Sequence, residues 1–568
     1  MLVSLLALLA LIAAACGGDD DAASGSDGTE ATDGTTDDGT DGTGDAGDSS
    51  DSAGEGDSAA DSGDTDSGAA DAMEPEYGGA IVVGLEGETG QGWNPATSQF
   101  AVSGHVVARA IFDPLTVEMP DGTVAPFLLE SFTPSADFTE WTLTMRPGIV
   151  FHDDTPADGE ALARHFEEVR KSTLLGSILR PLDTVTVVDD LSVSLTFTRP
   201  VADFPGWLTG QIGYLTAPSQ YDDDESASNP VGTGPFTFVE WIPDTKLVVE
   251  KNPNYWRTDG EGRELPFLDS IEFRPIPDSA TRKLALDSGD LDASIDNEAQ
   301  DFADYQADYE LTVEGEGYHN TSYLLLNTSK PPFDDVRVRR AVAMCTDRDL
   351  YNTLRWGVGD VASGPFSPGT PGYLEDAGFP AFDPDGGRDL LAEVGSLGTI
   401  TLGTTNDNFN RDSTELIASM WGDCGIDVQI KQVDQGELIT LAVTGDFEAF
   451  LWRNHNGFSL GLERVWWHSD YASGLALNFG RIQDATIDAA LDVALTDPDP
   501  AAVQAAAEDI NRAFGEQVYN IWFYWSNWLV AYGPELHDVG AITTPEGTPA
   551  LPMIEGRVFF TEAWMSAG

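Results

Sequence analysis

The sequence predicts an α/β protein in which mixed β-sheets are flanked by helices. Three observations predict this class: a hairpin pattern over residues 184–197, a strand–helix–strand pattern over residues 399–430, and a capped amphipathic helix that begins near residue 500. The chain has 568 residues, of which 41% are hydrophobic and 10% aromatic. A chain of this length can bury large cores and holds about three to four domain-sized units.

The hairpin pattern comes first along the chain. Residues 184–188 and 192–197 alternate serine or threonine with apolar residues, and Asp189 and Asp190 lie between the two runs. Alternation with a period of two is typical of half-buried strands, and short polar residues between such runs are typical of a turn. The segment therefore predicts a β-hairpin.

The strand–helix–strand pattern follows later. Residues 399–402 alternate as a strand does, and Gly425 separates the next helix from a second alternating run at residues 426–430. The helix between them has apolar residues at helical spacing: Leu416, Ile417, Met420 and Trp421. A β-α-β unit joins parallel strands. We therefore expect a mostly parallel sheet in this region.

A further helix is predicted near the end of the chain. Asp499 precedes Pro500, and proline is favoured at the first helical position. Apolar residues then recur on one face: Val503, Ala506, Ile510 and Phe514. This pattern is typical of an amphipathic helix that packs against a core.

The first sixteen residues form an apolar run that ends in small residues and Cys16. This pattern is typical of a secretory signal, and it resembles the signals of bacterial lipoproteins, in which the cysteine thiol is lipidated and becomes the new amino terminus. The run is shorter than the ~20 apolar residues that a membrane span requires. We therefore expect lipidation at Cys16 and an extracytoplasmic protein anchored to the outer face of the cell membrane.

Residues 17–76 consist almost entirely of Asp, Gly, Ser, Thr and Ala and contain no Lys or Arg. Such a segment cannot bury enough apolar surface to fold, so we expect a disordered linker, with folded sequence starting near Tyr77. The formal net charge of the chain is −69. A charge of this sign repels nucleic acid, which is therefore excluded as a partner.

Three cysteines occur, Cys16, Cys345 and Cys424, and their spacing does not match a zinc site. The last two lie in apolar contexts typical of buried free thiols. An oxidising compartment would also permit a disulfide between them. We favour free thiols, with the disulfide as the alternative.

Two motifs near the middle of the chain carry a family resemblance. Residues 229–236 read Asn-Pro-Val-Gly-Thr-Gly-Pro-Phe, and residues 252–256 read Asn-Pro-Asn-Tyr-Trp. Together they resemble the signature of the bacterial extracellular solute-binding proteins, family 5, the peptide, opine and nickel class. Further segments match this family in the same order: residues 111–115, 121–122, 141–143, 146–148, 268–271, 289–292 and 332–339.

The Gly-Thr-Gly of the first motif is interpreted as scaffold. Gly232 and Gly234 are expected to adopt backbone angles that other residues rarely reach. A phosphate-binding loop is excluded because no Gly-Lys-Ser/Thr follows at the required spacing.

The resemblance implies a two-lobed, periplasmic-binding-protein-like fold of class II with an extra subdomain and a hinged cleft that closes on its ligand. The expected divisions are a signal (1–16), a linker (17–76), a first lobe (77–115, 225–320 and 525–568), an inserted subdomain (116–224) and a second lobe (321–524).

The same resemblance implies the substrate-binding lipoprotein of an ABC importer. Such a protein captures peptides or related solutes and delivers them to permease subunits in the membrane; a monomer with no cofactor and no catalytic residue is expected. Two alternatives stay open: an oligosaccharide-binding protein of the same fold, and an exported hydrolase. The second has little support, because no His-Glu-x-x-His or nucleophile-elbow spacing is present.

The candidate ligand site lies at residues 450–457, which correspond to a strand and loop that face the ligand in the family's peptide binders. In the oligopeptide binders an Asp in this loop grips the peptide's amino terminus, and His455 stands at that place here. The loss of the carboxylate removes a charge-assisted hydrogen bond to a cation, which keeps an oligosaccharide ligand open. The residues expected to bind ligand are Trp452, Arg453, Asn454, His455, Asn456, Trp466 and Trp467.

Two further expectations concern this site. Trp466 and Trp467 are expected on an extended strand, where neighbouring side chains point to opposite sides and one of the pair would line the cleft. A metal ligand role is not expected, because a single histidine without clustered partners makes a poor metal site.

Overall fold

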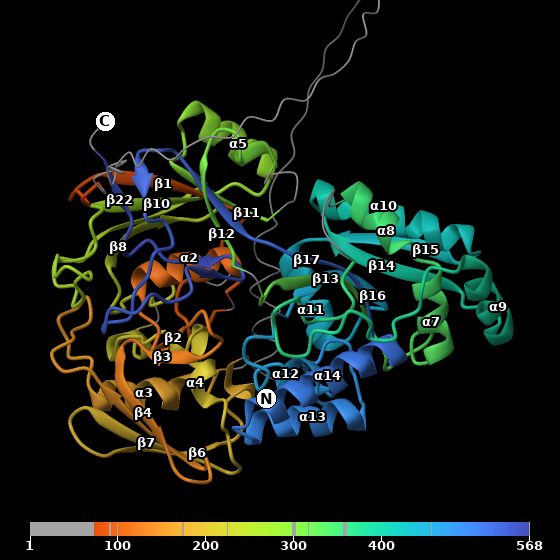
Figure 1. Cartoon of the computed structure of the whole chain (residues 1–568), viewed down its shortest axis with the longest axis horizontal. Coiled ribbons are helices and arrows are strands. Elements are labelled where there is room, and N and C mark those ends of the chain that lie inside the picture. The colour runs from red at the N-terminus through yellow and green to blue at the C-terminus, as the bar shows by residue number, and fades with distance from the viewer. Residues whose placement is uncertain are drawn as a thin grey trace, which may run out of the picture. The chain divides into compact units, whose positions relative to one another are not determined.

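The computed structural model describes residues 73–566, apart from residues 90–91, 99, 173–174, 224, 298–302, 316, 356–360 and 456 (Figure 1). The predicted signal, the anchor cysteine Cys16, the predicted linker up to residue 72, and Asn456 lie outside the described residues. Within the described part, no helix is both long and apolar enough to cross a bilayer.

A seven-stranded sheet contains segments from both ends of the described chain. Its strand order is β12-β18-β11-β1-β10-β9-β8. The strands are β1 (Ala80–Leu85), β8 (Phe236–Ile242), β9 (Lys246–Lys251), β10 (Ser270–Pro275), β11 (Ala293–Asp296), β12 (Glu310–Val313) and β18 (Leu529–Tyr532). The central strand β1 is parallel to both β10 and β11, whereas the other pairs are antiparallel. The helices of this part are α2 (Val102–Ile111) and α5 (Ser279–Ser288).

A four-stranded antiparallel sheet, ordered β4-β5-β7-β6, forms a separate subdomain. Its elements are β4 (Leu129–Pro134), β5 (Glu140–Met145), α3 (Gly159–Val169), β6 (Leu182–Val187), β7 (Ser192–Phe197) and α4 (Phe204–Trp207). The predicted hairpin is confirmed, because β6 and β7 pair in antiparallel register across the Asp189–Asp190 turn. The short strands β2 (Thr116–Glu118) and β3 (Val124–Pro126) and the 3-10 turns η1 (Leu175–Ser177), η2 (Gln211–Gly213) and η3 (Pro218–Tyr221) complete it.

A five-stranded sheet, ordered β15-β14-β16-β13-β17, makes up the third part. Its strands are β13 (Asn320–Leu326), β14 (Thr399–Thr405), β15 (Asp427–Val433), β16 (Ala449–Asn454) and β17 (Asn520–Ser526). Figure 1 shows α12, α13 and α14 on one face and α8 and α10 on the other. The helices are α7 (Val336–Met344), α8 (Arg348–Arg355), α9 (Pro384–Val394), α10 (Asn408–Asp423), α11 (Gln435–Thr444), α12 (Arg464–Trp467), α13 (Ala485–Thr496) and α14 (Pro500–Gln517).

Three sequence predictions concern this part of the fold. The β-α-β unit is confirmed as β14-α10-β15, with parallel strands and Gly425 in a left-handed conformation (φ 84°) after the helix. The helix after Asp499 is confirmed as α14, whose first-turn amide at Ala501 donates to the Asp499 side chain. The expectation of a mostly parallel sheet is wrong, since β16–β13 and β13–β17 are antiparallel and the sheet is mixed.

The chain crosses between the seven- and five-stranded sheets twice, through residues 314–319 between β12 and β13 and through residues 527–528 between β17 and β18. After β18 the chain stays with the seven-stranded sheet, where short strands end the fold. These are β19 (Leu536–His537), β20 (Met553–Ile554), β21 (Arg557–Val558) and β22 (Trp564–Met565). One further turn, η4 (Ser469–Tyr471), follows α12.

The two signature motifs meet at one buried carboxylate. Asp113 accepts hydrogen bonds from Tyr255 Oη (2.9 Å), Trp256 Nε1 (2.9 Å) and Thr233 Oγ1 (3.1 Å). Burial raises the pKa of Asp113 to about 6. The motif residues therefore hold the scaffold together, as their interpretation from the sequence proposed.

Glycine is required at positions 232 and 234 for a different reason from the one expected. Neither Gly232 nor Gly234 has a positive φ. A Cβ atom would instead lie 2.2 Å from the carbonyl oxygen of Ile111 at Gly232 and 2.6 Å from it at Gly234. Glycine is needed here because the backbone passes directly against the end of α2.

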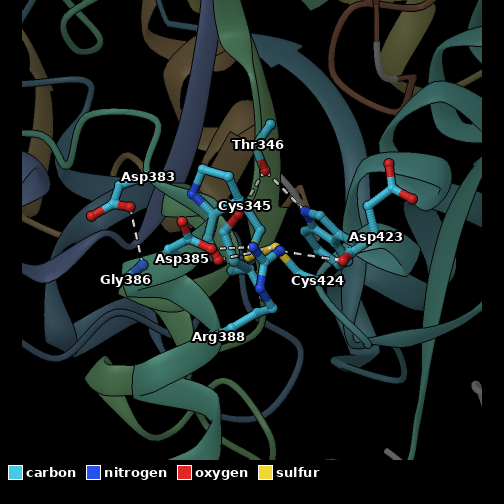
Figure 2. The surroundings of a disulfide bond; sticks show 11 residues. Cys345, Thr346, Asp383, Asp385, Gly386, Arg388, Asp423 and Cys424 are labelled. Carbon is cyan, nitrogen blue, oxygen red and sulfur yellow. Dashed lines mark hydrogen bonds and ion pairs between the residues drawn. A yellow bond between two sulfur atoms is a disulfide. The ribbon is translucent and has the colours of Figure 1, made fainter.

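Cys345 and Cys424 form a disulfide, with their Cα atoms 6.2 Å apart (Figure 2). The preference for free thiols is therefore wrong. Both residues do lie in an apolar cluster, which is the context that suggested free thiols. The bond joins the residue after α7 to the residue after α10, 79 positions later. A separation of this size gives no local sequence signal for pairing.

Candidate functional site

His455 directly follows β16 and has a left-handed backbone conformation, with φ 69°. Its side chain is only 4% exposed, and both ring nitrogens have partners. Nδ1 lies 2.6 Å from Oε2 of Glu463, and Nε2 lies 3.0 Å from the hydroxyl of Tyr323. Burial, with a smaller effect of Glu463, raises the pKa of Tyr323 well above its usual value, so that hydroxyl stays protonated. With Tyr323 donating to Nε2, the Nδ1 proton is donated to Glu463.

Trp466 and Trp467 lie in the short helix α12, so the expectation of an extended strand is wrong. The Trp467 ring is 1% exposed and its centroid lies 4.6 Å from that of His455. Trp466 is half-buried and meets the His455 ring edge-on at 6.1 Å. Both rings line a small cavity with His455, Tyr323 and Phe479. Both tryptophan rings thus contact the ring of His455.

The remaining predicted residues lie at the end of β16. Trp452 is half-buried and packs edge-on against Phe479, with centroids 5.3 Å apart. Arg453 reaches toward the seven-stranded sheet, where Nη2 lies 3.3 Å from Oε1 of Glu86. Its guanidinium also lies over the Trp528 ring at 4.9 Å. Asn454 is half-buried and pairs with Thr321 in the β13–β16 ladder.

A second carboxylate comes from the short strands that follow β18. Glu555 lies between β20 and β21, accepts from Asn320 Nδ2 at 2.8 Å and pairs with Arg557 at 3.1 Å. Burial raises the pKa of Glu555, Arg557 lowers it, and the negative charges of Glu463 and Glu314 raise it. Glu463 thus contributes to the raised pKa of Glu555, although the two residues belong to parts of the fold built on different sheets.

The crossing segment 314–319 and the last residue of β17 contribute two further groups. Glu314 is 6% exposed and lies 3.2 Å from His319 Nδ1. Burial raises its pKa. Ser526 is fully buried, and its hydroxyl has no hydrogen-bond partner among the described residues. Because Ser526 pairs directly with Asn320 in the antiparallel ladder, both side chains point to the same face, toward Glu555.

Sequence reasoning missed the carboxylates of this region. Glu463 and Glu555 stand among 97 acidic residues, so neither could be singled out by type. The nearest signal is local: Glu463 precedes the Val465-Trp466-Trp467 run that was selected. Among the described residues, no group of three or more His, Cys, Asp or Glu side chains is arranged to hold a metal ion.

Two α/β sheets joined by two crossing segments, with charged and aromatic side chains where the segments cross, define the two-lobed fold of a periplasmic binding protein. Among solved structures, the periplasmic binding protein DppA from Helicobacter pylori in complex with the peptide STSA is similar, with a TM-score of 0.75 and 21% identity. The alignment covers 87% of this chain and 99% of DppA.

The chain belongs to the bacterial extracellular solute-binding proteins, family 5, whose middle-region model matches residues 123–473. Proteins of this family are substrate-binding components of ABC importers. The chain is 26% identical to di/tripeptide-binding protein 2 of Pseudomonas aeruginosa over 65% of its own length and 75% of the relative. It is 27% identical to the nickel-binding periplasmic protein of Escherichia coli, over 63% and 70%.

Proposed function

We propose that this protein is the lipid-anchored substrate-binding protein of a peptide importer. It captures a short peptide, or a related amide-bearing solute, between two lobes and delivers it to permease subunits in the membrane. The divisions expected from the sequence serve as the lobe boundaries, Cys16 as the anchor, and Trp452, Arg453, Asn454, His455, Asn456, Trp466 and Trp467 as ligand contacts. The protein acts as a monomer and catalyses no reaction.

The observation that carries the peptide proposal is the contact between His455 and Glu463. The sequence places a histidine where the family's oligopeptide binders have the carboxylate that grips an amine. In the fold, the carboxylate of Glu463 lies 2.6 Å from that histidine, so an acidic group stands beside His455. A cationic amine could form a charge-assisted hydrogen bond with this carboxylate.

The two alternatives find less support in this arrangement. Trp466 and Trp467 would suit a sugar ring, but a neutral sugar offers no cation to pair with Glu463. A hydrolase built on His455 would need a nucleophile bonded to this ring. Tyr323 and Glu463 occupy both of its nitrogens instead.

A thermal-shift panel tests the proposal. The mature protein is screened with tri- and tetrapeptides, cello- and other oligosaccharides, opines and nickel chelates. A ligand that binds only the folded state stabilises it by about 2.7 kcal/mol at 100 times its Kd. We expect peptides with a free amine to raise the melting temperature. Stabilisation by oligosaccharides and by no peptide would overturn the peptide proposal.

A further inference from the structure

The four-stranded subdomain contacts the loop that carries Glu463. Asp203, at the start of α4, accepts hydrogen bonds through Oδ2 from Ser459 Oγ at 2.5 Å and from the Gly461 amide at 3.0 Å. A Cβ atom on Gly461 would lie 2.6 Å from the same Oδ2. Glycine at this position therefore permits the close approach of the loop to the carboxylate.

Apolar side chains also pack at this contact. Leu495, at the end of α13, is fully buried within the hydrophobic cluster of the four-stranded subdomain, and Leu462 packs against that cluster. The Ala202 amide also donates to the Leu495 carbonyl at 2.7 Å. The contact therefore includes backbone, apolar and charged groups, and Asp203 lies at its centre next to residues 458–463.

The loop leads directly to the ligand site. Gly461 is held by Asp203, and Glu463, two residues later, is bonded to His455. We propose that Asp203 is a positioning residue of the ligand site, supplied by the inserted subdomain. Its carboxylate fixes residues 458–463 and thereby the Glu463–His455 pair. The inserted subdomain is then part of the binding machinery. The role of Asp203 in the ligand site rests on the proposed function, whereas its hydrogen bonds to the loop do not.

The charged groups near this contact pair with one another. From the four-stranded subdomain, Arg199 lies 3.5 Å from Asp492, and Arg180 donates to the Asp470 carbonyl at 3.3 Å. On the other side, Arg464 pairs with Asp492 at 2.6 Å and with Asp470 at 3.3 Å, and His468 lies 3.6 Å from Asp470.

Burial raises the pKa of Asp203 to about 6 when the loop is in contact. The hydrogen bonds from Ser459 and Gly461 act in the opposite direction, because they favour the ionised carboxylate.

Hydrogen exchange of the ligand-free mature protein tests whether Asp203 holds the loop, because exchange of residues 458–463 reports how often the loop is released. Asp203→Ala removes both hydrogen bonds and Gly461→Ala forces the loop away from the carboxylate, so each should speed corrected exchange of residues 458–463 at least tenfold. Asp203→Asn keeps an acceptor oxygen and should speed exchange less than Asp203→Ala.

Asp158→Asn is the matched control, because Asp158 caps α3 in the same subdomain through the Ala161 amide and lies away from the loop. It should keep the wild-type profile. Far-UV circular dichroism checks that each variant folds, and Gly461→Ala leaves the subdomain itself unchanged. Wild-type exchange of residues 458–463 in Asp203→Ala would overturn the proposal. Since no ligand is added, this outcome is independent of the ligand panel.

Discussion

Nδ1 of His455 lies 2.6 Å from Oε2 of Glu463, eight positions later in the segment that joins β16 to α12. The acidic group beside the histidine therefore comes from a residue further along the chain. Because Tyr323 holds the opposite ring nitrogen, the imidazole is fixed and the carboxylate is oriented by it. Changing His455 should therefore alter the orientation of the Glu463 carboxylate, whereas changing Glu463 should remove the carboxylate itself.

Glu463→Gln should weaken binding of a free-amine tripeptide by about 10- to 100-fold, because a charge-assisted hydrogen bond contributes roughly 1.5–3 kcal/mol. The amino-terminally acetylated form of the same peptide should bind wild type and variant equally. Isothermal titration calorimetry measures both affinities. Glu415→Gln, on the exposed face of α10, is the control. Equal losses for both peptide forms would show that Glu463 does not meet the amine.

Asp113→Asn should destabilise the fold by about 1–3 kcal/mol, because an amide nitrogen would face at least one of three donors. The pKa of Asp113 is raised to about 6 in the folded state, so folding takes up a proton and the wild type gains stability as the pH falls through 6. The variant lacks this gain. The difference should therefore grow by about 1.4 kcal/mol from pH 8 to pH 5, measured by urea unfolding at both values. A difference that shrinks at pH 5 would contradict this sign.

The sequence was sufficient for local elements and insufficient for contacts between them. The β14-α10-β15 unit, the β6-β7 hairpin and α14 could be predicted because apolar spacing, a turn pair and a capping Asp-Pro act within a few residues. The partners of His455 could not, since no pattern distinguishes Glu463 from the other acidic residues. Asp203 lies 256 positions before Ser459, and only the fold brings them together.

Lipidation at Cys16 should decide whether the protein stays with the membrane. Cys16→Ser should move it from the membrane fraction to the soluble fraction, as measured by fractionation and immunoblotting.

The linker should contribute nothing to stability, because it has too little apolar content to offset chain entropy. A chain that starts at Met73 should therefore melt at the same temperature as the mature protein. A clearly lower melting temperature would show that the linker docks on the fold.

The Cys345–Cys424 disulfide should stabilise the fold substantially, because it closes a loop of 79 residues. Chain-entropy reasoning gives about 4 kcal/mol for a loop of this size. Cys345→Ala alone breaks the bond and should lose about as much stability as the Cys345→Ala, Cys424→Ala pair. If apolar packing of the sulfur atoms were the main effect, the pair would lose nearly twice as much as the single change. Alkylation under denaturing, non-reducing conditions should leave both cysteines of the wild type unmodified, and their labelling without a reductant would contradict the disulfide.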